Sequence, residues 1–468
     1  MKTTSSPTVL DEQAETTWRP TILTLLTVLV GAAFLLPARF VVKGPLGAAG
    51  RPSLLVGLLL LLVWALTLFA LVERRPLQPV RVFVGLYVGV WSLTVGLAHL
   101  RGMSPPEASG ADRYFLITAS LCGIALATAD LMPDRSSVDV LLRRLTWVGA
   151  FMGFVGFLQF QFDYNLVERL TIPGLRLSDD LLGIRQRGAE KFNRASGTAQ
   201  HSIEFAVLSA MLFPIALHYA IGAAGQAARL RRWCVVCLVT VGVPFSLSRS
   251  GVLAFGAAFL VMFRVWERRT QRIAILATVG TVLLLRVAIP GLVGTFVSFF
   301  ANTDEDRSVA GRTSDYALIS ELFSDRPWFG LGGGTFRPEE YFVVDNYMLN
   351  ALVATGLVGL TTVLVLFLGS YSTAVRLSRS AQQAEDRHLA TALAASLAAA
   401  FVASFTFDSL NFPTFGVLMF LIIGLTGALH RLLPADHAPE RGRHYGKVVK
   451  SARGMRPLAF RHTDAYQK

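Results

Sequence analysis

Three clusters of polar residues interrupt an otherwise apolar chain, and each contains residue types that can bind a phosphate or move a proton. The first cluster consists of Ser246, Ser248, Arg249, Ser250 and Gly251. The connection between the flanking apolar segments is short, so the Arg249 guanidinium stays near one surface, where its planar fork suits bidentate binding of a phosphate. The alternative is that Arg249 only extends its charged end toward water.

The second cluster precedes and enters an apolar segment. It contains Lys191, Asn193, Arg194, Ala195, Ser196, Gly197, Thr198, His201 and Glu204. Glu204 lies inside the start of a predicted apolar helix, where an ionised side chain is costly and is by default a candidate for function. The alternative is a carboxylate that the positive end of the helix dipole stabilises.

The third cluster extends over a long polar segment. It contains Gly311, Arg312, Asp315, Tyr316, Pro327, Trp328, Gly330, Gly332, Gly333, Gly334, Phe336, Arg337, Asp345, Asn346 and Tyr347. The glycines lack the strand–turn–helix context of a phosphate-binding loop, so they predict a tight turn whose backbone approaches another segment closely. Asp345 is a candidate proton acceptor, and the alternative is that it caps the following helix.

The composition determines what kind of protein carries these clusters. The chain has 468 residues, of which 53% are hydrophobic and only 16% are charged, and its mean hydropathy is +0.51. Soluble chains carry about 25% charged residues, and a span needs about 20 apolar residues. The sequence therefore predicts an all-α polytopic membrane protein. The net charge of +13 does not indicate nucleic acid, because the basic residues lie between apolar segments.

Hydropathy predicts about twelve transmembrane helices with two long loops on the outer side. The predicted spans are 21–42, 53–72, 79–99, 113–132, 140–161, 202–224, 233–247, 250–267, 271–290, 351–372, 387–407 and 412–431. The seventh span is short and contains Pro244, so a broken helix is a possibility there.

Lys and Arg concentrate in alternate short connections and in the C-terminal tail, which predicts that both termini are cytoplasmic. The resulting organisation is a cytoplasmic segment (1–20), helices one to five (21–161), an outer loop (162–201), helices six to nine (202–290), a large outer catalytic loop (291–350), helices ten to twelve (351–431) and a basic cytoplasmic tail (432–468). Loops of this length are usually functional, so we expect any chemistry on the outer side.

No metal or other cofactor is implied by the sequence. Cys234 and Cys237 form a C-x-x-C pair within an apolar segment, without the further ligands of a zinc site. Asp304, Glu305 and Asp306 are interpreted as a solvated acidic turn.

The three clusters, in this order and placement, resemble the O-antigen ligase/polymerase family of bacterial membrane glycosyltransferases. Over most of the chain the matching elements are Arg194-Ala195-Ser196-Gly197-Thr198, Ser248-Arg249-Ser250-Gly251, Arg312 followed by Pro327 and Gly330 to Gly334, and Asp345-Asn346-Tyr347 with Leu349 and Gly356. Ligases that join O-antigen to lipid A core carry His at the position of Asp345. The resemblance therefore favours a polysaccharide polymerase over such a ligase.

The resemblance implies a GT-C-like helical membrane fold and an inverting transfer of a glycan from a polyprenyl-diphosphate-linked donor to an acceptor sugar hydroxyl. It implies that the enzyme acts at the outer face of the bacterial cytoplasmic membrane, with polysaccharide-export proteins as possible partners. The implied catalytic residues are Asp345, Arg249 and Arg312. The implied substrate-binding residues are Arg194, His201, Glu204, Arg337, Asn346 and Tyr347. The alternative function is a transporter or flippase of lipid-linked oligosaccharides.

Overall fold

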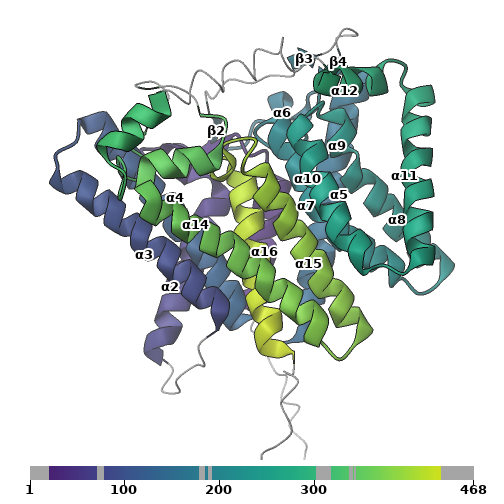
Figure 1. The fold of residues 1–468 in the computed structure, drawn as a ribbon, viewed down its shortest axis with the longest axis horizontal. Coiled ribbons are helices and arrows are strands. Elements are labelled where there is room, and N and C mark those ends of the chain that lie inside the picture. Colours follow the sequence, from purple (N-terminus) through teal and green to yellow (C-terminus); the bar gives the residue numbers. More distant parts are fainter. Residues whose placement is uncertain are drawn as a thin grey trace, which may run out of the picture.

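The computed structural model is a bundle of long helices with short strands and helices gathered at one end (Figure 1). It describes residues 21–70, 78–178, 185–187, 192–301, 318–336, 341 and 344–433. The elements are α1 (Ile22–Phe34), β1 (Phe40–Val42), α2 (Pro52–Ala70), α3 (Pro79–Leu100), α4 (Pro105–Leu131), α5 (Arg135–Phe162), α6 (Leu166–Arg169), β2 (Leu175–Leu177), β3 (Arg185–Arg187), β4 (Phe192–Arg194), α7 (Ser202–Ile221), α8 (Gln226–Thr240), α9 (Gly242–Phe245), α10 (Arg249–Val265), α11 (Arg268–Ala288), α12 (Leu292–Ala301), α14 (Tyr347–Ser380), α15 (Ala384–Ala403) and α16 (Pro413–Leu432). Short 3-10 helices cover Gly47–Gly50 and Ser409–Asn411.

Each of the twelve predicted spans coincides with a helix. Within the described ranges, eight helices are long and apolar enough to cross a membrane, namely α2, α3, α4, α5, α7, α11, α14 and α16. Helix α1 is a shorter apolar helix, and α8, α10 and α15 occupy the remaining predicted spans. The prediction of an all-α polytopic membrane protein is confirmed.

The helix ends differ from the predicted ones where local chemistry overrides hydropathy. The helix in the predicted span 21–42 is α1, which ends at Phe34, because Pro37 disfavours a helical residue before it and lacks an N–H group. The end of the same span forms β1 (Phe40–Val42). The seventh span is interrupted near Pro244, as considered from the sequence: α8 ends at Thr240 and the four-residue α9 follows. Helix α14 begins at Tyr347, inside the predicted loop 291–350, and that loop also contains α12 and a helix over 318–325.

Several helices begin at residues that satisfy the first free N–H groups. Ser104 and Glu107 form a capping box at the start of α4, and the Asp134 side chain accepts a hydrogen bond from the Ser137 N–H at the start of α5. Proline occupies the first helical position of α3, α4 and α16, where its missing N–H costs nothing. These signals are local, so they fix where each helix enters the bundle.

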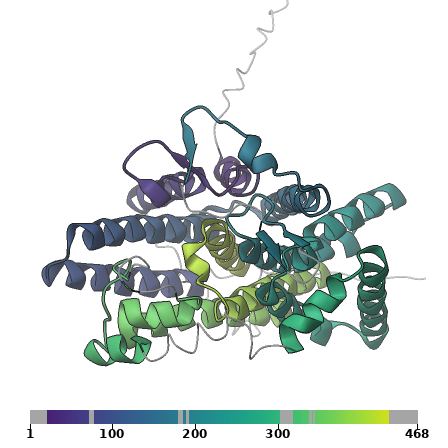
Figure 2. The same cartoon turned by 90° about the horizontal axis from the view of Figure 1, so that it is seen from above.

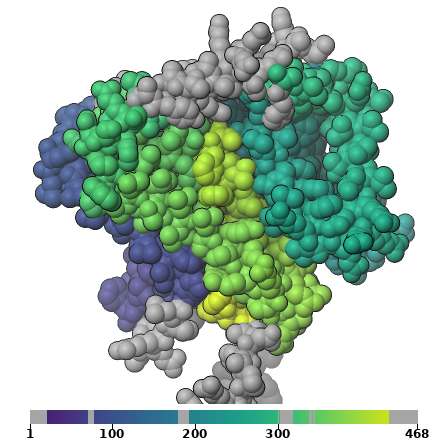
Figure 3. Space-filling view, in the orientation of Figure 1, coloured from purple at the N-terminus to yellow at the C-terminus, as the bar shows by residue number. Residues whose placement is uncertain are grey.

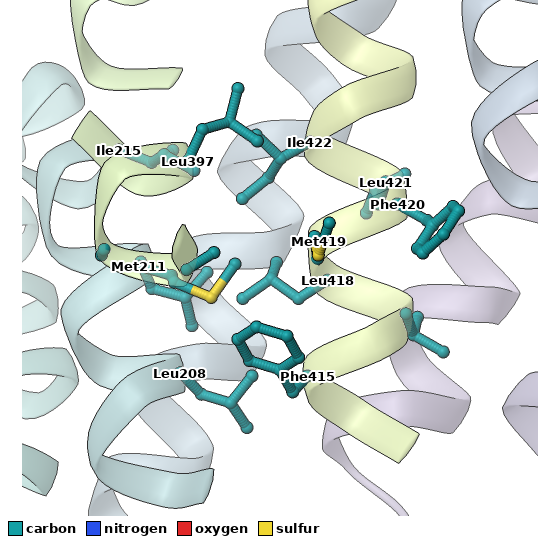
Figure 4. Packing of buried hydrophobic residues seen from close by; sticks show 14 of the residues in the cluster. Leu208, Met211, Ile215, Leu397, Phe415, Leu418, Met419, Phe420, Leu421 and Ile422 are labelled. Atoms are coloured by element: carbon teal, nitrogen blue, oxygen red, sulfur yellow. The ribbon is translucent and has the colours of Figure 1, made fainter. Parts of the chain in front are cut away.

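Helix α16 lies in the middle of the bundle (Figure 2). In the stretch that would cross the membrane, 83% of its residues are buried. Its large side chains pack against α7 and α15, where Leu208, Met211 and Leu397 face Phe415 and Leu418 (Figure 4). Toward α4 the interface is narrow instead, because a Cβ atom at Gly424 would lie 2.7 Å from the Ala125 carbonyl oxygen. Small residues thus let α4 and α16 approach closely.

Helix α11 stands at the edge of the molecule (Figure 3). None of its residues is buried by the rest of the protein, although its sequence is apolar enough to cross a membrane. An apolar helix without a packed face is stable in lipid, where its backbone groups bond within the helix.

The short strands and helices α6 and α12 lie at one end of the bundle (Figure 1). Strands β1 and β2 pair antiparallel with Phe40 opposite Leu177, and β3 and β4 pair with Arg185 opposite Arg194. Both long predicted loops therefore contain secondary structure, and they meet at the same end.

The glycine-rich turn packs against a break in α14. At Gly356 the backbone of α14 leaves the helical conformation, with φ of +64°. The backbone groups that lose their partners within the helix bond to the turn instead. The Leu357 N–H donates to the Pro327 carbonyl (2.9 Å), and the Gly332 N–H donates to the Ala354 carbonyl (2.7 Å). Gly330, with φ of +63°, approaches the same stretch of α14. The predicted tight turn is confirmed, and the segment that it approaches is α14.

We predict that Gly330→Ala and Gly356→Ala each destabilise the protein. Both residues have positive φ, which costs about 1–3 kcal/mol for an alanine, and a Cβ atom would overlap the Val353 carbonyl oxygen or the Trp328 carbonyl. Thermal unfolding in detergent should therefore shift to lower temperature. Gly89→Ala is the control, because Gly89 lies in α3 with no atom within 4 Å of its added Cβ. Equal melting temperatures for all three variants would contradict this account.

Candidate functional site

The connection between α15 and α16, residues 404–412, is the point where the predicted site elements meet; we call it the α15–α16 turn. The Tyr347 N–H donates to the carbonyls of both Ser404 (3.0 Å) and Phe407 (3.1 Å), which fixes the start of α14 on this turn. Inside the turn, the hydroxyls of Ser404 and Ser409 lie 2.7 Å apart. The sequence motif around Asp345 is thereby anchored by backbone contacts.

Arg249 is the first residue of α10 and lies on the other side of this turn. Ser248 caps the helix, and the neighbouring Ser250 hydroxyl donates a long hydrogen bond (3.5 Å) to the Thr406 carbonyl. The half-buried guanidinium of Arg249 donates from Nη1 to the Phe299 carbonyl in α12 (3.1 Å). Just before this element, the fully buried Leu247 adopts a φ of +49°, a strained conformation that persists only where the surroundings enforce it.

Arg194 is held against the same segment. Its Nε donates to the Ser246 carbonyl (3.0 Å), and the Ala195 N–H donates to the Phe245 carbonyl (3.1 Å). Gln159 of α5 fixes the rest of this motif, since its side-chain oxygen accepts from the Gly197 N–H (2.7 Å) and its amide donates to the Gly197 carbonyl (2.9 Å). The structure thus brings the Arg194 and Arg249 motifs together.

His201 and Glu204 connect α7 to the α15–α16 turn. His201 caps α7, with Nδ1 accepting from the Ile203 N–H (3.1 Å), and its ring lies 6.1 Å from that of Phe412. The buried Glu204 carboxylate accepts from the N–H groups of Thr414 (2.9 Å) and Phe415 (3.0 Å), in the first turn of α16. It also accepts from the Gln200 N–H (2.8 Å). Glu204 therefore satisfies the start of a helix other than its own.

Asp345 is exposed next to the capping residue of α14. The cap is Asn346, whose side-chain oxygen accepts from the Met348 N–H (3.0 Å) and the Leu349 N–H (3.3 Å). The alternative interpretation, in which Asp345 caps the helix, is wrong. Among the residues that the structure describes, the Asp345 carboxylate makes no hydrogen bond, so it is not committed to holding the fold.

Tyr347 points into the protein and joins an aromatic cluster. It is 1% exposed, its hydroxyl lies 3.5 Å from that of Tyr87, and its ring stacks on Trp91 at 6.5 Å. Trp91 in turn stacks on Tyr114 at 5.3 Å. Tyr347 thus contributes to the wall behind the site. Arg312 and Arg337, predicted from the sequence, lie outside the described residues.

Asp408, in the α15–α16 turn, is a further polar residue of the site that no sequence motif indicated. Its carboxylate accepts hydrogen bonds from the side-chain amides of Asn350 (3.0 Å) and Asn411. Burial raises the pKa of Asp408 from its ordinary 3.8 to about 7, and the nearby Asp345 adds to the rise, although the two amides oppose it. Polar residues in so short a connection between two apolar segments were the available signal.

Together these contacts place the Arg249 motif and the carboxylates of Asp345 and Asp408 beside the α15–α16 turn, and Arg194 joins the Arg249 motif through Ser246. A pair of cations is suited to stabilise negative charge on a phosphate, and a carboxylate is suited to accept a proton. These are the residue types that a group transfer from a phosphate requires.

Comparison with known proteins gives a family match for part of the chain. Residues 234–364 match the family model described as O-antigen ligase. The matched segment runs from α8 into the first half of α14, and it contains Arg249, the glycine-rich turn and Asp345–Tyr347. No curated protein matches the chain.

We predict that Glu204→Gln lowers the stability of the protein by about 1–3 kcal/mol, because one oxygen that accepts a buried N–H becomes an amide nitrogen. Thermal unfolding in detergent measures the effect. Glu385→Gln is the matched control, since Glu385 is an exposed carboxylate in the first turn of α15. A Glu204→Gln protein with unchanged stability and a raised KM would instead support the substrate-binding prediction.

We predict that Asp408 makes stability depend on pH between about 4 and 7. In this window the folded protein keeps a proton that the unfolded chain has released, because folding raises the pKa of Asp408. The stabilisation is complete below about pH 4 and is lost as the pH rises toward 7. Melting temperatures across this range should fall more steeply for the wild type than for Asp408→Asn. The exposed Asp163→Asn variant should follow the wild type, and parallel curves for all three would contradict the prediction.

Proposed function

We propose that this chain is a polysaccharide polymerase of the O-antigen ligase/polymerase family, on the basis of the family match over residues 234–364. It transfers a glycan from a polyprenyl-diphosphate-linked donor to a sugar hydroxyl of an acceptor glycan, at the outer face of the bacterial cytoplasmic membrane. The observation that carries this proposal is the pairing of the Arg194 and Arg249 motifs through Ser246, with Asp345 across the α15–α16 turn.

Arg249 stabilises the departing diphosphate. Its guanidinium is positioned by Ser248, which caps α10, and by the hydrogen bond to the Phe299 carbonyl. Fixed cations directed at developing negative charge usually supply the largest electrostatic contribution to such a reaction. Arg194 adds a second cation beside Ser246, and Arg312 and Arg337 are the further candidates from the sequence.

Asp345 is the general base. It is exposed at the start of α14, and Asn346 rather than Asp345 provides the helix cap, so the carboxylate is available for a proton. A carboxylate is ionised at neutral pH, since its ordinary pKa is near 4. The family position of the base holds Asp here rather than the His of lipid A core ligases, which supports a polymerase.

The reaction is a single displacement. The acceptor hydroxyl oxygen forms a bond to the anomeric carbon of the donor while the bond from that carbon to the diphosphate oxygen breaks. The hydroxyl proton passes to Asp345, and the electron pair leaves with the polyprenyl diphosphate beside Arg249. Attack opposite the leaving group inverts the anomeric centre.

We predict that Arg249→Ala and Asp345→Asn each abolish polymer formation in proteoliposomes that contain polyprenyl-diphosphate-linked oligosaccharide from the producing strain. We expect a loss of about 10²–10³-fold for the arginine and about 10²–10⁴-fold for the base. Electrophoresis of the labelled glycan measures chain length. Arg286→Ala is the control, because Arg286 is an exposed arginine in the last turn of α11.

Two results would contradict the proposal. Wild-type chain lengths from correctly folded Arg249→Ala or Asp345→Asn protein would remove the assigned roles. Movement of the lipid-linked oligosaccharide across the bilayer without new glycosidic bonds would identify a flippase instead.

A further inference from the structure

A cavity of about 230 Å³ lies beside the α15–α16 turn, between α3, α4 and α14. Aromatic side chains form much of its wall, namely Trp91, Tyr114 and Phe336. The glycine-rich turn contributes Gly334, where a Cβ atom would lie 2.7 Å from the Gly110 carbonyl oxygen. On that side the wall is formed by the close approach of the glycine-rich turn to α4. Any larger residue at Gly334 would push the turn away from α4.

The cavity is also lined by polar groups. Asn350 and Asn411 lie on its wall, and each donates one amide N–H to the Asp408 carboxylate behind them. An amide also carries a second N–H and an acceptor oxygen. Asp408 therefore fixes the orientation of two amides that retain bonding capacity for a ligand. Arg113 supplies a charge at the same wall.

Two buried polar atoms at this place lack partners in the described part of the chain. Trp91 is 2% exposed and lines the cavity, yet its indole Nε1 has no acceptor. The Asp408 Oδ1 atom is buried and has no donor. A buried polar group that is left without a hydrogen bond costs about 1–3 kcal/mol of stability. Asp408 lies behind the wall, whereas Trp91 lines it, and the unpaired indole N–H is a donor that suits the acceptor oxygen of a hydroxyl group.

We propose that this cavity is the subsite for the acceptor, and that it holds one sugar ring of the acceptor glycan. The apolar face of the ring packs on the aromatic wall, while its hydroxyl groups bond to Asn350, Asn411 and the Trp91 indole. This inference rests on the proposed function and names the position of one of its two substrates.

The size of the cavity agrees with a single ring. Pockets for drug-sized ligands measure about 300–1,000 Å³, so this cavity is too small for an oligosaccharide. The remainder of the glycan therefore extends outside.

The cavity is also placed for the reaction. Asn350 follows Asp345 by little more than one helical turn of α14, and the Asp345 and Asp408 carboxylates are close enough to interact electrostatically. A sugar held by Asn350 presents a hydroxyl on the side where the proposed base lies.

Binding of a lipid-free oligosaccharide tests the subsite apart from catalysis. The probe is the repeat-unit oligosaccharide that mild acid releases from the lipid-linked pool of the producing strain, titrated calorimetrically into the full-length protein in detergent. We expect saturable binding by the wild type and by Asp345→Asn. Asn350→Ala and Trp91→Phe should each weaken binding about three- to tenfold, which corresponds to one lost hydrogen bond.

Trp91→Phe keeps an aromatic ring at this wall and removes the indole N–H together with the second ring, so it tests recognition even if Asn350→Ala unfolds. Trp147→Phe is its control, because Trp147 is exposed on α5. Equal dissociation constants for folded wild type, Trp91→Phe and Asn350→Ala would overturn the subsite, as would an absence of binding by the wild type. Glycan extension is measured on the same preparations. Extension with unaltered binding in the variants refutes only the subsite, whereas binding without extension by the wild type refutes only the polymerase.

Discussion

A buried helix start needs partners for its free N–H groups, and α16 obtains them from a carboxylate two hundred residues away in the chain. Glu204 accepts from the Thr414 and Phe415 N–H groups, while Pro413 occupies the first position and has no N–H to satisfy. In a membrane interior no water replaces such a partner. This contact fixes the central helix against α7, and thereby fixes where the α15–α16 turn lies.

The site is assembled on this turn mainly through backbone groups. The Tyr347 N–H meets the carbonyls of Ser404 and Phe407, and the Ser250 hydroxyl meets the Thr406 carbonyl. Because these contacts use carbonyl groups of the turn, they position α14 and α10 independently of the side chains that the turn carries. The side chains of Arg249 and Asp345 are therefore positioned by the fold, and Arg249 also joins α10 to α12 through the Phe299 carbonyl.

Hydropathy predicted the helices, whereas local chemistry sets their ends, and of these only the interruption near Pro244 was considered from the sequence. The capping box starts α4 at Pro105, although the predicted span began at residue 113. The glycine-rich turn was also predictable as a close approach, but the identity of its partner was not. Lateral packing decides which segments meet, and apolar patterns contain little information about it. Asp408 was missed for this reason, because its role depends on a hydrogen bond from Asn350, which is distant in sequence. Glu204 was recognised as unusual, although the helix that it caps could not be read from its surroundings.

The arrangement also explains how two large glycans can meet at one bond without competing for one space. Helix α10 with Arg249 lies on one side of the central α16, whereas α3 and α14, which line the cavity, lie on the other (Figure 1). A displacement requires the nucleophile and the leaving group on opposite sides of the anomeric carbon. In the proposed reaction the diphosphate lies beside Arg249 and the acceptor ring lies near Asn350, so that the anomeric carbon is held beside the α15–α16 turn. Asp345 stands on the acceptor side, where the proton is released. In this proposal Arg249 faces the leaving group and Asp345 faces the hydroxyl, so the two charges act on opposite sides of the reacting carbon.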